Sequence, residues 1–140
     1  MKENDIDILA RTIYGEARGE TDLGKMAVAS VILNRYKAKK WFSGTTIAET
    51  CQFCVKGSKF HQFSCWNESD PNFKKLISVT TEDAQFSKCL EIAKKYISGE
   101  LKDVVCGACH YHTVNVLPKW AKNKKADFLI GNHLFYCGIL

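Results

Sequence analysis

The feature that most constrains the fold is an apolar stretch at residues 23–36, whose centre is MAVASVIL at 26–33. An amphipathic helix can lie at a protein surface, but a helix that is apolar on nearly every side needs other elements around it. Its small side chains, among them Ala27 and Ala29, allow a neighbouring helix to approach closely. Thr21 or Asp22 provides an N-cap. The sequence therefore predicts a buried central helix with the rest of the chain packed around it.

Two further helices are predicted, one before and one after this central helix. The first is expected to have Asp5 or Asp7 as its N-cap and to end within residues 15–19, where two glycines occur. The second spans residues 80–99, where apolar residues repeat at helical spacing up to a terminating glycine. Residues 37–79 show no sustained period, so we expect a long irregular region that holds short elements.

A small sheet is predicted in the C-terminal third. Residues 104–106 and 108–114 form short runs rich in β-branched and aromatic residues. Residues 128–130 and 133–136 flank the dipeptide Gly131-Asn132, which is typical of a hairpin. The predicted fold class is therefore α+β, mostly helical, with a small antiparallel sheet from the C-terminal third.

Length and composition predict one compact domain, residues 1–140, because 46% hydrophobic residues suffice for a full core. The chain has no run of 18 apolar residues and opens on the acidic MKENDID. We therefore expect no signal peptide, no stable membrane insertion, synthesis in the cytoplasm and a monomer. Seven cysteines, an odd number, in a chain without an export signal predict reduced thiols.

Two glutamates in the segment IYGEARGE are the candidate catalytic residues. Glu16 and Glu20 are four residues apart, so on a helix they share a face, and both flank the apolar stripe of the first helix. Partial burial and a like-charged neighbour would raise the pKa of at least one carboxyl group of this pair, as a general acid requires. The alternative is a solvated pair at a fraying helix end. Gly15 and Gly19 favour the functional interpretation, because such glycines indicate close backbone approach or a deliberate helix terminus.

Four segments carry a resemblance that covers most of the chain. ARTIYGEARGE at 10–20, followed by AVASVILNR at 27–35, is its most specific part. QFSCW at 62–66 resembles a QFSxW element, and IGNHLF at 130–135 resembles a closing IGxHxF element. Together these segments resemble the spore-cortex-lytic, germination-type cell wall hydrolase family.

The resemblance implies a lysozyme-like domain that cleaves the glycan strands of peptidoglycan in the manner of a lytic transglycosylase, with Glu16 as the catalytic acid. Glycosidases with two catalytic carboxylates place them about 5 Å or more apart across the sugar. Glu16 and Glu20 lie on the same side, so we expect a single-acid mechanism in which Glu20 is a neighbouring charge or a substrate contact. Asp70 is the second carboxylate to consider if the reaction is hydrolytic. This scheme needs no metal and no cofactor.

Substrate binding calls for flat and hydrogen-bonding side chains, because sugars present apolar faces and hydroxyl rims to a groove. The candidates are Gln62, Ser64, Trp66 and Tyr111. Trp66 could equally be a core residue of the irregular region. His112 and His133 are weaker candidates, since either is more often structural.

The net charge of +5, with lysines gathered in several short runs, favours an anionic partner such as a wall polymer. A catalytic domain without an export signal suggests a phage or prophage endolysin or a bacterial wall-remodelling enzyme. We expect it to act on the cell wall after release from the cytoplasm.

A different class of function is suggested by the cysteines. Cys51-x-x-Cys54 and Cys106-x-x-Cys109 have the spacing of a structural zinc site, and histidines lie nearby. With the positive charge, they favour a zinc-stabilised nucleic-acid-binding module or nuclease. Against this alternative, 51 residues separate the two pairs and the basic residues are scattered. We therefore expect peptidoglycan, and not nucleic acid, as the partner.

Overall fold

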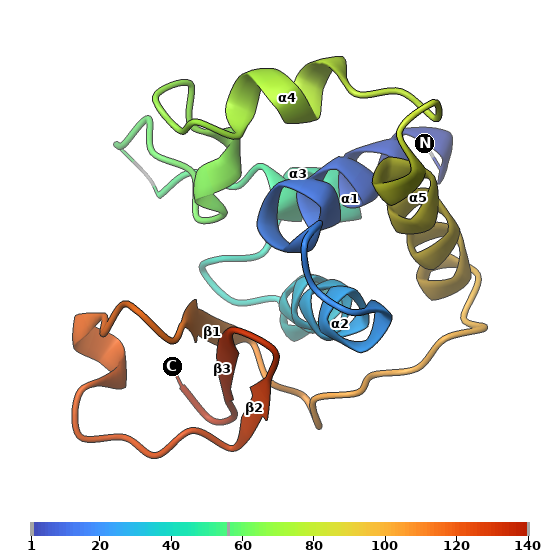
Figure 1. Ribbon diagram of the computed structural model, residues 1–140. Coiled ribbons are helices and arrows are strands. Elements are labelled where there is room, and N and C mark those ends of the chain that lie inside the picture. The colour runs from blue at the N-terminus through green and yellow to red at the C-terminus, as the bar shows by residue number, and fades with distance from the viewer. Residues whose placement is uncertain (1, 56, 140) are drawn as a thin grey trace.

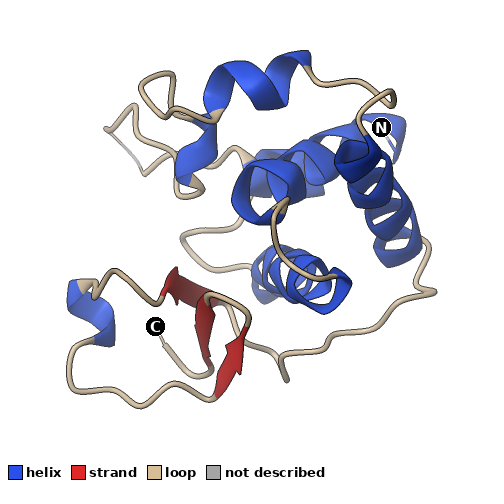
Figure 2. Cartoon of the chain, in the orientation of Figure 1, coloured by secondary structure: helices blue, strands red, loops and turns tan. Residues whose placement is uncertain are grey.

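The computed structural model describes residues 2–55 and 57–139. Helices and a three-stranded sheet form two parts of the domain, with the sheet on the side of α2 in the view of Figure 1. Figure 2 shows the three strands next to one another, and all of them come from the C-terminal third. The elements are α1 (Lys2–Ala17), α2 (Asp22–Ala38), α3 (Ile47–Cys51), η1 (Ser64–Trp66), α4 (Phe73–Ser78), α5 (Ala84–Ile97), β1 (His110–Thr113), η2 (Lys119–Ala121), β2 (Phe128–Ile130) and β3 (His133–Tyr136). The predicted α+β class is confirmed.

The apolar helix α2 is the centre of the domain, as predicted. Thr21 is its N-cap and accepts a hydrogen bond from the Gly24 amide at 3.2 Å. One side of α2, including Val28 and Ile32, packs into the main core with α1 and α5. Another side, including Val31, packs against the sheet. Because both sides are fully buried, α2 joins the helical part of the domain to the sheet.

The start of the first helix differs from the prediction. α1 begins at Lys2, so neither Asp5 nor Asp7 is its N-cap. The Asp5 carboxylate accepts a hydrogen bond from the Ala48 amide at 2.9 Å, within the first turn of α3. Asp7 pairs with Arg11 one turn along α1, at 3.0 Å. Each side chain has a partner other than the α1 backbone, which sequence spacing alone does not reveal.

The helix predicted at residues 80–99 is present as α5 but is shorter, because residues 80–83 and 98–99 are not helical. α5 begins after Asp83, whose carboxylate accepts hydrogen bonds from the amides of Gln85 and Phe86. The irregular region 37–79 holds three short elements, α3, η1 and α4. None of the helices within the described ranges has both the length and the apolar character needed to cross a bilayer.

Gly15 permits a close approach between α1 and the segment around η1. A Cβ atom at this position would lie 2.7 Å from Cys65 Cβ and 2.9 Å from Leu76 Cδ2. Both neighbours are buried, so neither has room to withdraw. Gly19 lies beyond the end of α1, where a Cβ would meet nothing within 4 Å. The two glycines thus have the two roles expected of them, close approach at Gly15 and helix terminus at Gly19.

Gly15→Ala should lower the free energy of unfolding by about 1–3 kcal/mol, because the added methyl group overpacks the contact with Cys65. Gly19→Ala is the matched control and should change it by no more than about 0.5 kcal/mol. Urea denaturation followed by circular dichroism measures both. Equal effects of the two substitutions would show that the close approach at Gly15 carries no cost of its own.

The sheet has the order β1-β3-β2 and is antiparallel throughout. The predicted hairpin is present, with Ile130 opposite His133 on either side of Gly131-Asn132. The predicted strand at 104–106 is wrong, because these residues form bends and turns, and Cys106 has a positive φ of 49°. Only residues 110–113 of the run 108–114 are extended as β1. A residue in the left-handed backbone conformation cannot continue a strand. The turn at Cys106 brings the chain back toward α2.

Candidate active site

A cleft of about 350 Å³ lies between the helical part of the domain and the sheet. Its walls come from the end of α1, from Arg35 of α2, from the segment before and within η1, and from the sheet. Its lining residues come from segments far apart in the sequence. They are Gly15, Glu16, Arg35, Gln62, Phe63, Ser64, Asn72, Tyr111, His112, Thr113, Val116 and His133. Among the described residues, Glu16 is the one carboxylate that lines this cleft.

Glu16 is held in place by the sheet. The Tyr111 hydroxyl of β1 donates a hydrogen bond to Glu16 Oε1. Tyr111 is itself fixed by aromatic contacts, since its ring stacks on Phe135 at a centroid distance of 5.5 Å and meets the His133 ring edge at 5.0 Å. Burial and the nearby Glu16 carboxylate raise the pKa of Tyr111 well above its usual range. The phenol is therefore protonated at neutral pH and available as a donor to Glu16.

Arg35 supplies the positive charge of the cleft. Its Nε atom donates to the Cys109 carbonyl at 2.6 Å, and its guanidinium lies over the rings of Phe42 and Phe63. Burial lowers the pKa of Arg35, and the negative charge of Glu16 is among the factors that oppose this shift. Sequence analysis did not single out Arg35 as a site residue. The available signal was its position at the end of the buried helix, where a charged residue needs specific partners.

Glu20 contacts the hairpin. Its Oε1 accepts a hydrogen bond from the backbone amide of Asn132, and its Oε2 accepts one from the Asn132 side-chain amide, both at 3.0 Å. A Cβ at Gly131 would lie 2.0 Å from Glu20 Oε1, so only glycine fits beside this pair of hydrogen bonds. Glu20 lies beyond the end of α1, and its side chain ties that end to the turn between β2 and β3.

The pKa of Glu20 is lowered. The sequence predicted a raised pKa for at least one carboxyl group of the pair, and Glu20 is not that group. Burial acts in the upward direction, but the two hydrogen bonds from Asn132 and the positive charge of nearby Lys25 outweigh it. Glu20 is therefore ionised at neutral pH. The arrangement suits an anchor for the hairpin better than a proton donor.

The lowered pKa of Glu20 implies that this residue stabilises the fold in a pH-dependent way. Since the folded-state pKa lies below the unfolded-state value, Glu20 stabilises the fold above its unfolded pKa, and this stabilisation is lost as pH falls through the folded pKa. Glu20→Gln should therefore be less stable than the parent near pH 7, and the difference should shrink below about pH 4. Thermal unfolding across this range, with the exposed Glu82→Gln as control, measures the effect. A difference that is constant with pH would contradict it.

Three of the four candidate substrate-binding residues line the cleft. Gln62, Ser64 and Tyr111 do so, and Ser64 is exposed. Trp66 does not line it. Trp66 is 6% exposed, and its indole Nε1 donates to Thr12 Oγ1 in α1 at 3.0 Å. The structure thus places Trp66 in the core, which is the alternative that the sequence left open.

The two weaker histidine candidates both line the cleft but differ in their partners. His112 Nε2 lies 2.8 Å from the Tyr136 hydroxyl, and its Nδ1 lies 2.7 Å from the Thr113 carbonyl oxygen. His133 is buried, and within the described residues its Nδ1 has no hydrogen-bond partner. Burial lowers the pKa of His133, although the negative charges of Glu20 and Glu16 oppose this shift. His133 is therefore an uncharged ring at neutral pH.

The arrangement of the cysteines does not support the zinc alternative. Cys51 lies in the main core with a pKa raised by burial to about 12, whereas Cys106 is exposed in the turn before β1. Cys54 lies 3.5 Å from His61 Nδ1, an isolated pair. Across residues 2–55 and 57–139, no group of three or more His, Cys, Asp or Glu side chains is placed to hold a metal ion.

Asp70, the second carboxylate considered for a hydrolytic reaction, does not line the cleft. Its side chain accepts a hydrogen bond from the Asn72 amide at 2.8 Å.

The fold and the cleft define an α+β domain in which a single carboxylate faces a groove between helices and sheet. Residues 19–136 match the family described as Cell Wall Hydrolase. This match covers most of the chain, and the chain belongs to the cell wall hydrolase family. The matched range includes Glu20 and begins shortly after Glu16.

Solved structures and curated relatives agree with this assignment. The catalytic domain of the Bacillus cereus SleB protein is 27% identical, with a TM-score of 0.67, over 96% of this chain and 90% of that one. The catalytic domain of germination-specific lytic transglycosylase SleB from Bacillus anthracis has a TM-score of 0.66 at 27% identity, over 96% of this chain and 94% of that one. The SleB-like fold is thereby confirmed.

Two spore cortex-lytic enzymes match a shorter part of the chain. The enzyme of Halalkalibacterium halodurans is 61% identical over 33 residues, which is 24% of this chain and 10% of that protein. The enzyme of Bacillus subtilis is 62% identical over 35 residues, which is 25% of this chain and 12% of that protein. The chain thus matches about a tenth of the length of these relatives.

Proposed function

We propose that this protein cleaves the glycan strands of peptidoglycan, with Glu16 as its single catalytic acid. The observation that carries the proposal is that Glu16 is the one carboxylate lining the cleft within the described residues. Family membership and the similarity to the Bacillus anthracis protein, a germination-specific lytic transglycosylase, support it. Glu20 is engaged by Asn132, so it does not serve as an opposing carboxylate.

The proposed reaction follows from the chemistry of one carboxyl group. Protonated Glu16 donates its proton to the glycosidic oxygen as the bond from that oxygen to the anomeric carbon of the muramoyl residue breaks. The 6-hydroxyl group of the same muramoyl residue attacks the anomeric carbon and transfers its proton to the Glu16 carboxylate. The products are a strand end with a free hydroxyl and a 1,6-anhydro sugar, and Glu16 is again protonated.

The remaining cleft residues have supporting roles in this proposal. Tyr111 fixes the position of the Glu16 carboxyl group, and Arg35 balances charge in the cleft. Gln62 and Ser64 present polar groups to sugar hydroxyls. The biological setting we propose is that of a monomeric endolysin or wall-remodelling enzyme that acts on the wall after release. The excess of basic residues would favour contact with an anionic wall.

Mass spectrometry of fragments released from purified peptidoglycan tests the reaction. The proposal expects muropeptides that end in anhydro sugars, which lack the added water. Fragments with reducing ends would show hydrolysis, in which a water molecule activated in the same cleft attacks the anomeric carbon. Release of new amino groups without new sugar ends would refute glycan cleavage altogether.

Tyr111→Phe should lower kcat on wall fragments by about ten- to hundredfold, because the Glu16 carboxyl group loses the hydrogen bond that positions it. KM should change little, since the phenyl ring keeps its contacts with Phe135 and His133. Tyr136→Phe is the matched control, because it removes a sheet hydroxyl that bonds His112 and not Glu16. An equal loss of kcat in both variants would mean that damage to the sheet, and not positioning of Glu16, is responsible.

A further inference from the structure

A second cavity, of about 410 Å³, is lined by the same chain segment that contributes to the cleft. Residues 62–64 line the cleft, whereas residues 59–61 and 66–69 line this second cavity. Because the two sets of residues adjoin along the chain, the two cavities lie near each other. A polymer bound in the cleft with side branches could place a branch in the second cavity.

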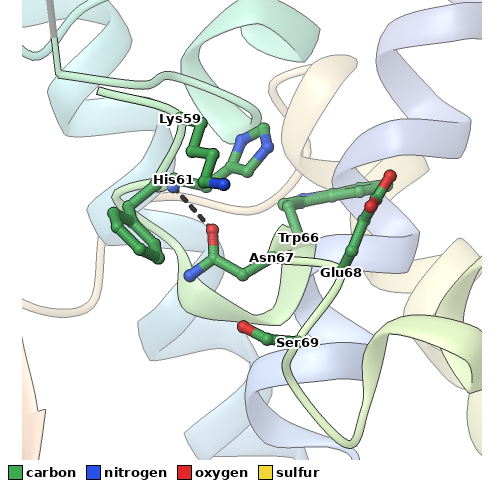
Figure 3. Close-up of a pocket in the computed structure, with 7 residues that line it drawn as sticks. Lys59, His61, Trp66, Asn67, Glu68 and Ser69 are labelled. Carbon is green, nitrogen blue, oxygen red and sulfur yellow. Dashed lines mark hydrogen bonds between the residues drawn. The ribbon is translucent and has the colours of Figure 1, made fainter. Parts of the chain in front are cut away.

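The walls of this cavity are fixed by hydrogen bonds. The His61 amide donates to Asn67 Oδ1 at 2.7 Å, a contact drawn in Figure 3. His61 Nδ1 lies 2.7 Å from the Gln52 carbonyl oxygen, and because a carbonyl only accepts, this nitrogen carries the proton. The bond from Trp66 to Thr12 fixes the indole from behind. The cavity is thus preformed, which lowers the entropic cost of binding a ligand.

Opposite charges face each other across the cavity. Figure 3 shows the Lys59 side chain and the Glu68 carboxylate on opposite sides, with the edge of the Trp66 indole between them. Both charged residues are exposed, and neither forms an ion pair with another described residue. Phe60, which is 60% exposed, and the indole add apolar surface. Such a site is complementary to a ligand that carries a carboxylate, an ammonium group and short apolar side chains.

We propose that this cavity binds the peptide stem of the wall polymer, with Lys59 contacting a stem carboxylate and Glu68 a stem ammonium group. The inference rests on the proposed function, because it takes the glycan strand as the occupant of the cleft. In peptidoglycan the stem branches from the muramoyl residue, the sugar whose bond is cleaved. Stems carry both free carboxylates and a diamino acid, which matches the charges of the cavity. The site would therefore favour strands that bear peptides over bare glycan.

Nuclear magnetic resonance titration of the full chain with the synthetic stem L-Ala-γ-D-Glu-L-Lys-D-Ala, acetylated at its N-terminus, tests the proposal. Shifts are expected at residues 59–61 and 66–69. Lys59→Gln and Glu68→Gln should each weaken binding by about fivefold, the effect of losing one partly exposed charge contact. Lys74→Gln and Glu82→Gln, exposed and outside the cavity, are matched controls that should leave the affinity unchanged.

A second peptide separates charge recognition from simple apolar binding. Acetylation of the stem lysine should weaken binding to the parent about fivefold and remove the difference between the parent and Glu68→Gln. Equal affinity of both peptides, no binding of either, or shifts confined to other surfaces would overturn the proposal. Because binding is measured on free peptide, Glu16→Gln should bind as the parent does. A protein that binds stems but cleaves no glycan would refute the proposed function while leaving the stem site standing.

Discussion

Glu16→Gln should lower the rate of wall clearance by about 10²- to 10⁴-fold, with the fold intact. Gln matches Glu in size, and its carbonyl oxygen can still accept the hydrogen bond from Tyr111. It can neither donate a proton to the glycosidic oxygen nor take one from the attacking hydroxyl. Because one residue has both tasks in the proposed reaction, the loss should lie toward the upper end. Turbidity of purified wall suspensions measures the rate, and circular dichroism verifies folding.

Glu20→Gln is the control for this substitution, because Glu20 comes from the adjoining turn but faces the hairpin. It should retain much more activity than Glu16→Gln, and its defect should follow the stability of the hairpin. A folded Glu16→Gln protein that clears walls within tenfold of the parent rate would overturn the assignment. So would a pair in which the Glu20 variant is the inactive one.

Trp66→Ala should destabilise the protein by about 3–5 kcal/mol, the usual cost of removing a buried aromatic side chain. Trp66 is 6% exposed, belongs to the main core and donates to Thr12, so its removal leaves both a cavity and an unpaired hydroxyl acceptor. Chemical denaturation measures the loss. Trp41→Ala is the control, since Trp41 is 57% exposed and its removal should cost much less.

Trp66→Phe keeps the prediction testable if the alanine variant does not fold. It preserves most of the packing and should lie between the parent and Trp66→Ala in stability, while KM for glycan strands without peptide stems stays near the parent value. A stable Trp66→Phe protein with a strongly raised KM for these bare strands would show that Trp66 contacts the glycan directly, as the sequence first suggested.

The sequence predicted the fold well where periodicity and capping are local properties. The buried helix α2, the apolar repeat of α5 and the hairpin around Gly131-Asn132 all follow from short-range patterns. The prediction was wrong where a long-range partner decides the outcome. Asp5 resembles an N-cap but bonds Ala48 from another helix, and Cys106 adopts a turn where its neighbours suggest a strand.

The site was predictable in part for the same reason. The glutamate motif and QFSCW indicated Glu16, Gln62 and Ser64, all of which line the cleft. The separate roles of the two glutamates depend on partners 95 and 112 residues away, Tyr111 and Asn132, and no local pattern contains them. The sequence therefore predicted a single catalytic acid but left Glu20 as a neighbouring charge or a substrate contact, whereas its hydrogen bonds place it against the hairpin.

In the proposed reaction, Glu16 faces the glycosidic bond that is cleaved. A crystal structure of the Glu16→Gln protein with a peptidoglycan oligosaccharide would show this arrangement. We expect the strand to lie in the cleft, with a glycosidic oxygen within about 3.2 Å of the side chain at position 16. A strand bound along another surface, or one whose glycosidic oxygens all lie far from this side chain, would contradict it.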